Sequence, residues 1–136
     1  MKLLMFYTSE WWYKTASKTL ATAADIEIEE AMHDAVTVFF HCEACDEERP
    51  AGVSEKFVKN VKWLAGKFGS RNVVLHSFNH LSSSKSSPEF ARQLIDDVII
   101  RLERTGYTVM QTPFGYLNEF RMHVAGDSLA KVFKEF

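Results

Sequence analysis

His80 is the side chain of this sequence whose type is best suited to moving a proton. It lies in the polar segment Ser77–Ser87, which is rich in serine and has no strand or helix periodicity. A loop histidine can act as an acid, as a base or as an orienting group, because its pKa is close to neutrality. A serine–histidine–aspartate triad is not indicated, since no Gly-x-Ser-x-Gly sequence is present and the serines lie in a tract predicted to be flexible. A histidine that is bonded only to its own loop backbone explains the pattern equally well.

A second candidate is the turn within residues 111–120, which contains Pro113, Phe114, Gly115 and Tyr116. Pro113 fixes its own φ, whereas Gly115 permits backbone conformations closed to other residues and a close approach to a partner. Such a turn can present backbone N–H and C=O groups to a ligand, and the two aromatic rings can wall a pocket or stack on a base. A buried hairpin with aromatic core residues is the alternative that spacing alone favours.

Cys42 and Cys45 form the only Cys-x-x-Cys sequence, and His41 precedes them. A zinc site requires two further ligands, but the remaining histidines show no paired spacing that would supply them. A redox pair of the thioredoxin type opens a helix, whereas an acidic run that ends at Pro50 follows here. The sequence therefore predicts reduced thiols at the end of a strand, without a metal.

Composition and charge limit the classes of protein to consider. The 136 residues are 46% hydrophobic and 25% charged, as in one ordinary globular domain over residues 1–136. A net charge of −2 excludes a protein that coats long stretches of duplex, but not a site for one nucleotide end. No apolar run approaches the roughly 20 residues of a membrane span, and the first residues lack a signal-peptide pattern. A cytoplasmic protein is expected.

Apolar patterning predicts the strands that position these loops. They are expected over Lys2–Thr8, Trp11–Thr15, Ala35–Cys42, Asn72–His76, Tyr107–Met110 and Phe120–Val124. A turn at residues 9–10 makes the first two strands a hairpin. Residues 35–42 are almost continuously apolar, which is typical of a central strand buried on both faces. Residues 25–30 fit a strand or a short helix.

Helical spacing of apolar residues predicts three helices. They are expected from Ser54, as the N-cap, to Gly69, from Pro88 to Thr105, and from Ser128 to Phe136. The first two each join predicted strands, so the chain should form two right-handed crossovers within one α/β domain that has a mixed sheet. The lysines of the first helix either meet nucleic-acid phosphates or form a solvated face.

Ligands of α/β sheets bind at the carboxyl ends of the strands. Residues 42–43, residues 77–80 and residues 113–116 all follow predicted strands. We therefore expect these three segments to meet in one site.

Four segments together resemble the editing domain of archaeal-type threonyl-tRNA synthetases. They are the strand Met1–Ser9, the segment Phe78–Ser83, the helix that begins at Pro88, and the turn Thr112–Phe120. The resemblance covers essentially the whole chain and implies the fold of the D-aminoacyl-tRNA deacylases. It implies hydrolysis of serine wrongly attached to threonine tRNA, assisted by the 2′-hydroxyl of the terminal adenosine and without a cofactor. It also implies a homodimer, and a synthetase catalytic module either in the same, longer chain or in a separate protein.

Two other functions fit the same resemblance: a free-standing D-aminoacyl-tRNA deacylase, and a non-catalytic module for tRNA binding or dimerisation. By position, the resemblance assigns substrate binding to Cys42, Glu43, Ser77, Phe78, Asn79, Phe114, Gly115, Tyr116 and Leu117. The catalytic candidates are His80, Asn118 and Lys131.

The chain departs from the family at two of these positions. Asn118 stands where many members carry a lysine, and Lys131 stands where they carry an acid. Lys131 is predicted either to reach the place left open at Asn118 or to be a solvated surface lysine. This departure favours catalysis by backbone groups, a positioned water and the RNA over catalysis by a side-chain base.

Overall fold

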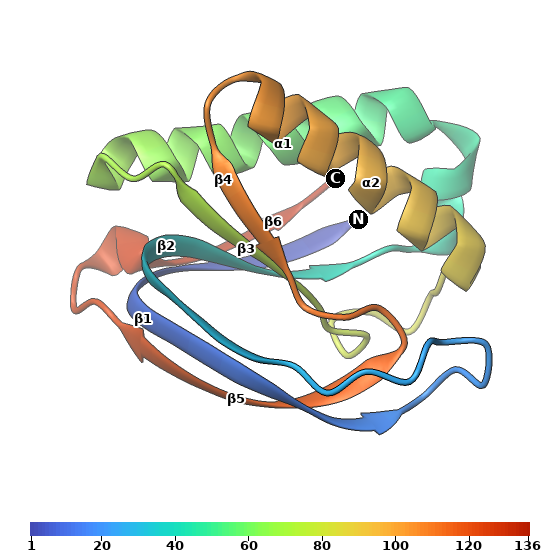
Figure 1. The fold of residues 1–136 in the computed structure, drawn as a ribbon. Helices are drawn as coiled ribbons and strands as arrows, with labels where there is room; N and C mark the ends of the chain where they lie inside the picture. The colour runs from blue at the N-terminus through green and yellow to red at the C-terminus, as the bar shows by residue number, and fades with distance from the viewer.

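A six-stranded mixed sheet with two helices on one face makes up the protein, in a computed structural model that describes all of residues 1–136 (Figure 1). The strands are β1 (Lys2–Lys18), β2 (Glu29–His41), β3 (Asn72–Ser77), β4 (Thr108–Gln111), β5 (Tyr116–Val124) and β6 (Lys131–Glu135). The helices are α1 (Pro50–Phe68) and α2 (Pro88–Arg104), with short 3₁₀ turns η1 (Ala44–Glu48) and η2 (Ser128–Ala130). The sheet order is β4-β3-β2-β1-β5, and β6 also pairs with β1. This confirms the predicted α/β class. No helix is long and apolar enough to cross a membrane.

The 17-residue strand β1 organises the sheet. One of its edges pairs with β2, and the other edge pairs with β6 over residues 2–6 and with β5 over residues 8–18. The predicted turn at residues 9–10 is therefore wrong, because the strand continues through it. The pairing of β1 with β5 shifts its register between Thr8 and Glu10, which is typical of a β-bulge. A bulge adds a residue to the strand without reversing the chain.

Two crossovers place the helices as predicted. Strands β2 and β3 are parallel and joined through α1, and β3 and β4 are parallel and joined through α2. Both helices lie on the same face of the sheet (Figure 1). The carboxyl ends of β2, β3 and β4 consequently lie at one edge, which brings the loops that follow them together.

The helices cover the main core. The apolar residues of α2 that recur at helical spacing are buried, namely Ala91, Leu94, Ile95, Val98 and Leu102. The start of α1 was predicted wrongly, because Pro50 at the first helical position begins the helix four residues before Ser54. Ser54 lies inside the helix, where its hydroxyl donates a hydrogen bond to the Asp97 carboxylate.

The last segment is a strand, so the predicted helix over residues 128–136 is wrong. Residues 131–135 form β6 along the first part of β1, which has an edge free there. Val132 and Phe136 pack against the main core. The backbone hydrogen bonds offered by that edge outweigh the helical spacing of the apolar residues, since strand formation depends strongly on context.

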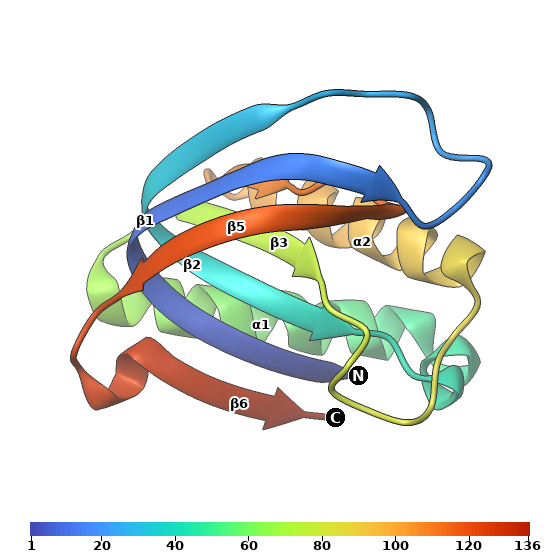
Figure 2. The same cartoon turned by 90° about the horizontal axis from the view of Figure 1, so that it is seen from below.

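The other face of the sheet has a smaller core. Its buried residues are Trp11, Tyr13, Ala35, Phe39 and Val74. Seen from below, β1, β2 and β5 curve across this side of the molecule, opposite the helices (Figure 2). The curvature gives the sheet a concave inner surface that aromatic side chains fill.

Gly115 has the special backbone conformation that the turn sequence predicts. Its φ is +80°, in a region that L side chains rarely adopt. A Cβ atom there would lie 3.2 Å from Leu20 and 3.3 Å from Ala23. The Gly115 carbonyl accepts a hydrogen bond from the Thr19 N–H at 2.7 Å, which ties the end of β1 to the turn.

We expect Gly115→Ala to lower the free energy of unfolding by about 1–3 kcal/mol, because it adds both backbone strain and a close contact with Leu20. Gly66→Ala is the matched control, since Gly66 lies in α1 with open space where a Cβ would go. The control should gain about 0.5–1 kcal/mol from helix propensity. Urea unfolding measures both, and equal stability of the two variants would contradict the assignment of strain to Gly115.

Candidate functional site

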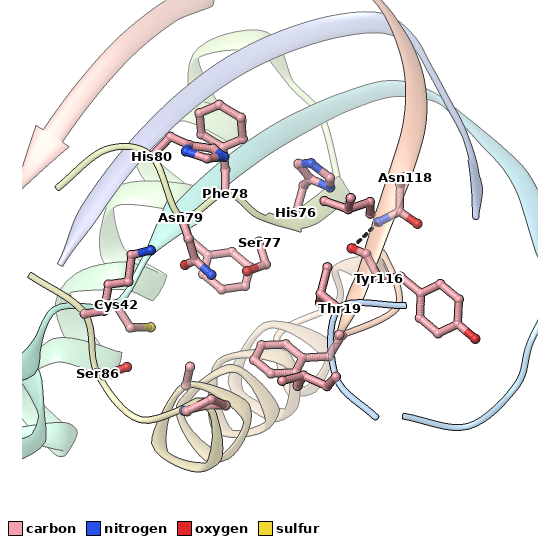
Figure 3. A pocket seen from close by; sticks show the side chains of 18 of the residues that line it. Thr19, Cys42, His76, Ser77, Phe78, Asn79, His80, Ser86, Tyr116 and Asn118 are labelled. Carbon is pink, nitrogen blue, oxygen red and sulfur yellow. Dashed lines mark hydrogen bonds between the residues drawn. The ribbon is translucent and has the colours of Figure 1, made fainter. Parts of the chain in front are cut away.

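The loops at the sheet edge enclose a cavity of about 370 Å³ (Figure 3). This volume is within the range of small-molecule sites. The walls come from the end of β2, from β3 and the loop after it, from the start of α2, from the turn before β5, and from the end of β1. The predicted meeting of three loop segments is therefore observed, with a fourth wall from residues 85–88 and a fifth from Thr19 and Leu20.

Most of the residues predicted for the site line this cavity. They are Cys42, Ser77, Phe78, Asn79, His80, Phe114, Gly115, Tyr116, Leu117 and Asn118. Two predicted residues, Glu43 and Lys131, do not. The lining residues that sequence reasoning missed are Thr19, Leu20, Phe40, His76, Lys85, Ser86, Ser87, Pro88, Ala91 and Phe120. Most of the missed residues are close in the sequence to the predicted loop segments. This closeness was the only indication in the sequence that they belong to the site.

Glu43 has a structural role in place of the predicted binding role. Its carboxylate accepts hydrogen bonds from the Met1 ammonium at 2.7 Å and from the Ser82 hydroxyl at 2.8 Å. Partial burial raises the pKa of Glu43, but these two hydrogen bonds, together with the positive charges of the Met1 ammonium and Lys2, outweigh burial and hold the pKa below its usual value. Asp46 accepts a second bond from the same ammonium at 2.8 Å. The acidic residues after β2 thus anchor the start of β1.

Lys131 lies far from Asn118 within one chain. In the sheet, Lys131 pairs with Phe6 and Asn118 pairs with Thr15, nine residues further along β1. At about 3.3 Å per residue, this separation is roughly 30 Å. The Lys131 ammonium instead donates a hydrogen bond to the Ala125 carbonyl at 3.1 Å. The predicted exchange, in which Lys131 of the same chain takes the place left open at Asn118, is wrong.

Asn118 itself has an unused polar atom at the cavity. Its Nδ2 donates to the Tyr116 carbonyl at 3.4 Å, shown as the dashed line in Figure 3. Its Oδ1 is buried without a hydrogen-bond partner. Buried polar atoms are nearly always paired, so this unpaired oxygen is an exception, and in this conformation it is closed to a ligand in the cavity.

The serine-rich loop is held by the end of β2 rather than being flexible as predicted. His41 is fully buried and its Nδ1 accepts a hydrogen bond from the Leu81 N–H at 3.1 Å. Since Nδ1 accepts, the proton is on Nε2, which donates to the Ser84 carbonyl at 2.7 Å. Further along, the N–H of Ser86 donates to the Cys42 carbonyl at 3.1 Å. The loop that carries His80 is therefore fixed at several points.

Several peptide N–H groups at the cavity have no acceptor within the chain, among them those of Asn79, Phe114 and Gly115. Asn79 is the middle residue of a tight turn in which the His80 N–H donates to the Phe78 carbonyl at 2.9 Å. Unpaired backbone donors held in fixed turns are suited to binding a carbonyl oxygen or a developing oxyanion.

His76 is the buried imidazole of the site. Its Nδ1 is hydrogen-bonded to Thr112 Oγ1 at 3.0 Å, and its ring packs against Trp11, Phe39 and Phe120. Burial lowers the pKa of His76 to about 4, so the ring is neutral near pH 7. The other ring nitrogen, Nε2, has no partner in the chain and is not sealed from the cavity. His76 therefore offers a neutral polar atom to a ligand.

The thiol of Cys42 is not chemically activated. It is buried in the cavity wall, and desolvation raises its pKa to about 12. A protonated thiol is neither a nucleophile nor a metal ligand. Cys45 is exposed in η1, and the two cysteines are not joined by a disulfide.

Tyr116 contributes its ring to the cavity but uses its hydroxyl elsewhere. The hydroxyl accepts from the Ile26 N–H at 3.1 Å and donates to the Ala24 carbonyl at 2.7 Å. Figure 3 shows it directed away from the cavity. Tyr116 thus fastens the connection between β1 and β2 over the turn that contains Gly115.

The strand order, the two crossovers and a cavity at the carboxyl ends of the strands define a single α/β domain with a mixed sheet and two helices. A solved structure of c-Myc DNA Unwinding Element Binding Protein shares the fold, with a TM-score of 0.65 over 100% of this chain and 99% of that chain. At 13% sequence identity, this likeness shows the fold alone.

Sequence comparison then gives the particular family. A model of the archaea-specific editing domain of threonyl-tRNA synthetase matches residues 1–136, and the chain belongs to this family. Threonine–tRNA ligases of Methanosphaerula palustris and Thermococcus onnurineus are 33% and 30% identical over 135 residues, which are 98% and 97% of this chain. The chain spans 22% of the length of each of these relatives. The resemblance stated from the sequence is thereby confirmed.

We expect His76 to make stability depend on pH between about pH 6.5 and pH 4. In this window the unfolded chain binds a proton at His76 and the folded chain does not, so the free energy of unfolding decreases as the pH falls. The loss approaches about 3 kcal/mol at pH 4. Urea unfolding of the wild type and of His76→Gln across this range measures the dependence. Because the variant keeps every carboxylate, the difference between the two proteins isolates the contribution of His76. The same pH dependence in both proteins would contradict a neutral His76.

Proposed function

We propose that this domain hydrolyses the ester of seryl-tRNA(Thr) and spares threonyl-tRNA(Thr). The observation that carries the proposal is the cavity itself, in a chain of the editing-domain family, walled by three backbone bends, two of which have unpaired N–H groups. Serine is smaller than threonine by one methyl group, so a site shaped for threonine discriminates against serine by only about 1–3 kcal/mol. A second site that rejects the larger amino acid by steric contact is therefore needed.

Rigid main chain suits this rejection better than long side chains, because it cannot move aside at low cost. The loop after β3 is fixed through Phe78, whose N–H donates to the Phe40 carbonyl at 3.0 Å, and the turn before β5 is fixed through Gly115. Binding of the seryl group is assigned to the cavity-lining residues predicted from the resemblance. Glu43 and Lys131 are omitted, since neither lines the cavity.

The hydrolysis requires little from side chains, because an aminoacyl ester is already activated. In the proposed reaction, water attacks the ester carbonyl, and N–H groups such as that of Asn79 stabilise the oxyanion. The 2′-hydroxyl of the terminal adenosine assists proton transfer, and no cofactor takes part. His80, which is exposed at the rim and packs edge-on against Phe78 at 5.1 Å, contacts the ligand.

The assembly is part of the same proposal. We propose a homodimer that receives the 3′ end of tRNA(Thr), with the synthetase catalytic module in the same or a separate chain. Exposed apolar side chains such as Leu117, beside the cavity, and Phe133, on β6, favour self-association. Trp11 does not contribute to such a surface, since it is fully buried within its own chain.

We expect the purified domain to hydrolyse seryl-tRNA(Thr) faster than threonyl-tRNA(Thr) by about tenfold or more, because the extra methyl group clashes with the fixed walls. Release of the labelled amino acid measures the two rates. A tRNA ending in 2′-deoxyadenosine should lose most of the serine release, and a chelator should leave it intact. Comparable hydrolysis of both esters would rule out the proofreading role. Preferential hydrolysis of a D-aminoacyl ester would assign a D-aminoacyl-tRNA deacylase instead.

We expect Cys42→Ser to retain most of the hydrolytic rate, within about threefold, because a thiol with a pKa near 12 takes no part as a nucleophile. Cys45→Ser, at the exposed cysteine, is the matched control. The initial rate of serine release measures both variants. A large loss in the Cys42 variant alone, with unchanged thermal stability, would instead point to thiol or metal chemistry.

A further inference from the structure

Lys85 is the sole lysine, arginine, aspartate or glutamate among the residues that line the cavity. It is exposed, and it makes no ion pair within the chain. An unpaired ammonium at the wall of an otherwise uncharged cavity favours a ligand with a negative group.

The backbone on both sides of Lys85 is fixed. The Ser84 carbonyl accepts from His41 at 2.7 Å, and the Ser86 N–H donates to the Cys42 carbonyl at 3.1 Å. Only the side chain of Lys85 is therefore free to move, and its ammonium stays within one side-chain length of the rim. This arrangement positions a charge without burying it, so that it can meet a hydrated anion at little desolvation cost.

A second unpaired cation lies near the same rim. The Arg92 guanidinium, on α2, lies over the ring of Phe114 at 5.8 Å from its centroid, and Phe114 lines the cavity. Arg92 is exposed and makes no ion pair. The nearest acid along α2, Glu89, is hydrogen-bonded to Gln93 at 2.9 Å. Lys85 and Arg92 thus place two free positive charges beside one opening.

We propose that Lys85 and Arg92 form an anion subsite that binds the phosphodiester group of an RNA 3′ end whose terminal nucleoside enters the cavity. The inference rests on the proposed function and adds the part of the substrate that these residues recognise. A cavity of about 370 Å³ holds the terminal nucleoside of the substrate, and the charged phosphate stays at the solvent-exposed rim. The chain has a net charge of −2, so local cations rather than the overall charge must supply the attraction.

The binding test uses the unacylated trinucleotide CCA, titrated by NMR against the full chain, so that it does not depend on hydrolysis. We expect Lys85→Met and Arg92→Met each to weaken binding about threefold to tenfold and to reduce the slope of log K against log salt by about 0.7. Lys85→Arg should restore most of the affinity, because it keeps the charge. Lys59→Met, at an exposed lysine of α1 outside the cavity, is the control and should change the affinity by less than about twofold. An unchanged salt slope in both the Lys85 and the Arg92 variant would overturn the proposal.

The kinetic test compares an ester that carries phosphodiester groups with an ester of the same terminal nucleoside that has none. One is a minihelix RNA charged with serine, and the other is 3′-seryl-adenosine, which has no phosphodiester. We expect Lys85→Met to raise KM for the RNA ester several times more than KM for the nucleoside ester. Equal losses on both esters would overturn the proposal and place Lys85 at the ester itself. If the wild type hydrolyses neither ester, the proposed function fails, and the CCA titration still decides whether the anion subsite exists.

Discussion

The hydrogen bonds between residues 41–47 and residues 81–87 are the interactions on which the cavity depends. His41 holds the loop at two points, and Glu43 holds it through Ser82. At the far end of the loop, Glu47 accepts a hydrogen bond from the Ser87 N–H at 2.7 Å, directly before α2 begins. Because the partners at His41 and Glu43 are buried or half-buried, they exchange few bonds with water, and the loop keeps one conformation. A segment with the composition of a flexible tract thus becomes a wall of the site.

The length of β1 determines which segments of the chain reach the site. One continuous strand pairs with β6 near its start and with β5 near its end, so the two halves of its outer edge serve different purposes. The first half closes the sheet beside the main core, and the second half brings the turn around Gly115 over the cavity. The same length separates Lys131 from Asn118. The two positions at which this chain departs from its family, Asn118 and Lys131, therefore do not meet within one chain.

The chemistry available in the cavity is that of fixed, mostly neutral groups. His76 is neutral because it is buried, and the thiol of Cys42 stays protonated for the same reason. Unpaired backbone N–H groups and the ring of His76 supply the polar contacts. Charge is confined to the rim, at Lys85 and Arg92. Neutral groups in the cavity and cations at its rim suit a substrate in which a neutral ester group is attached to a polyanionic RNA.

Sequence periodicity by itself determined the buried face of α2, the central strand β2 and the crossovers, because amphipathic helices and apolar strands depend on local residue order. It also determined the unusual conformation at Gly115, and motif resemblance indicated most of the cavity residues. Only the tertiary structure decided that residues 131–135 form a strand, that Glu43 binds Met1, and that His76 and Lys85 face the cavity. These outcomes depend on partners more than 30 residues away in the sequence, and spacing within one segment carries no information about them.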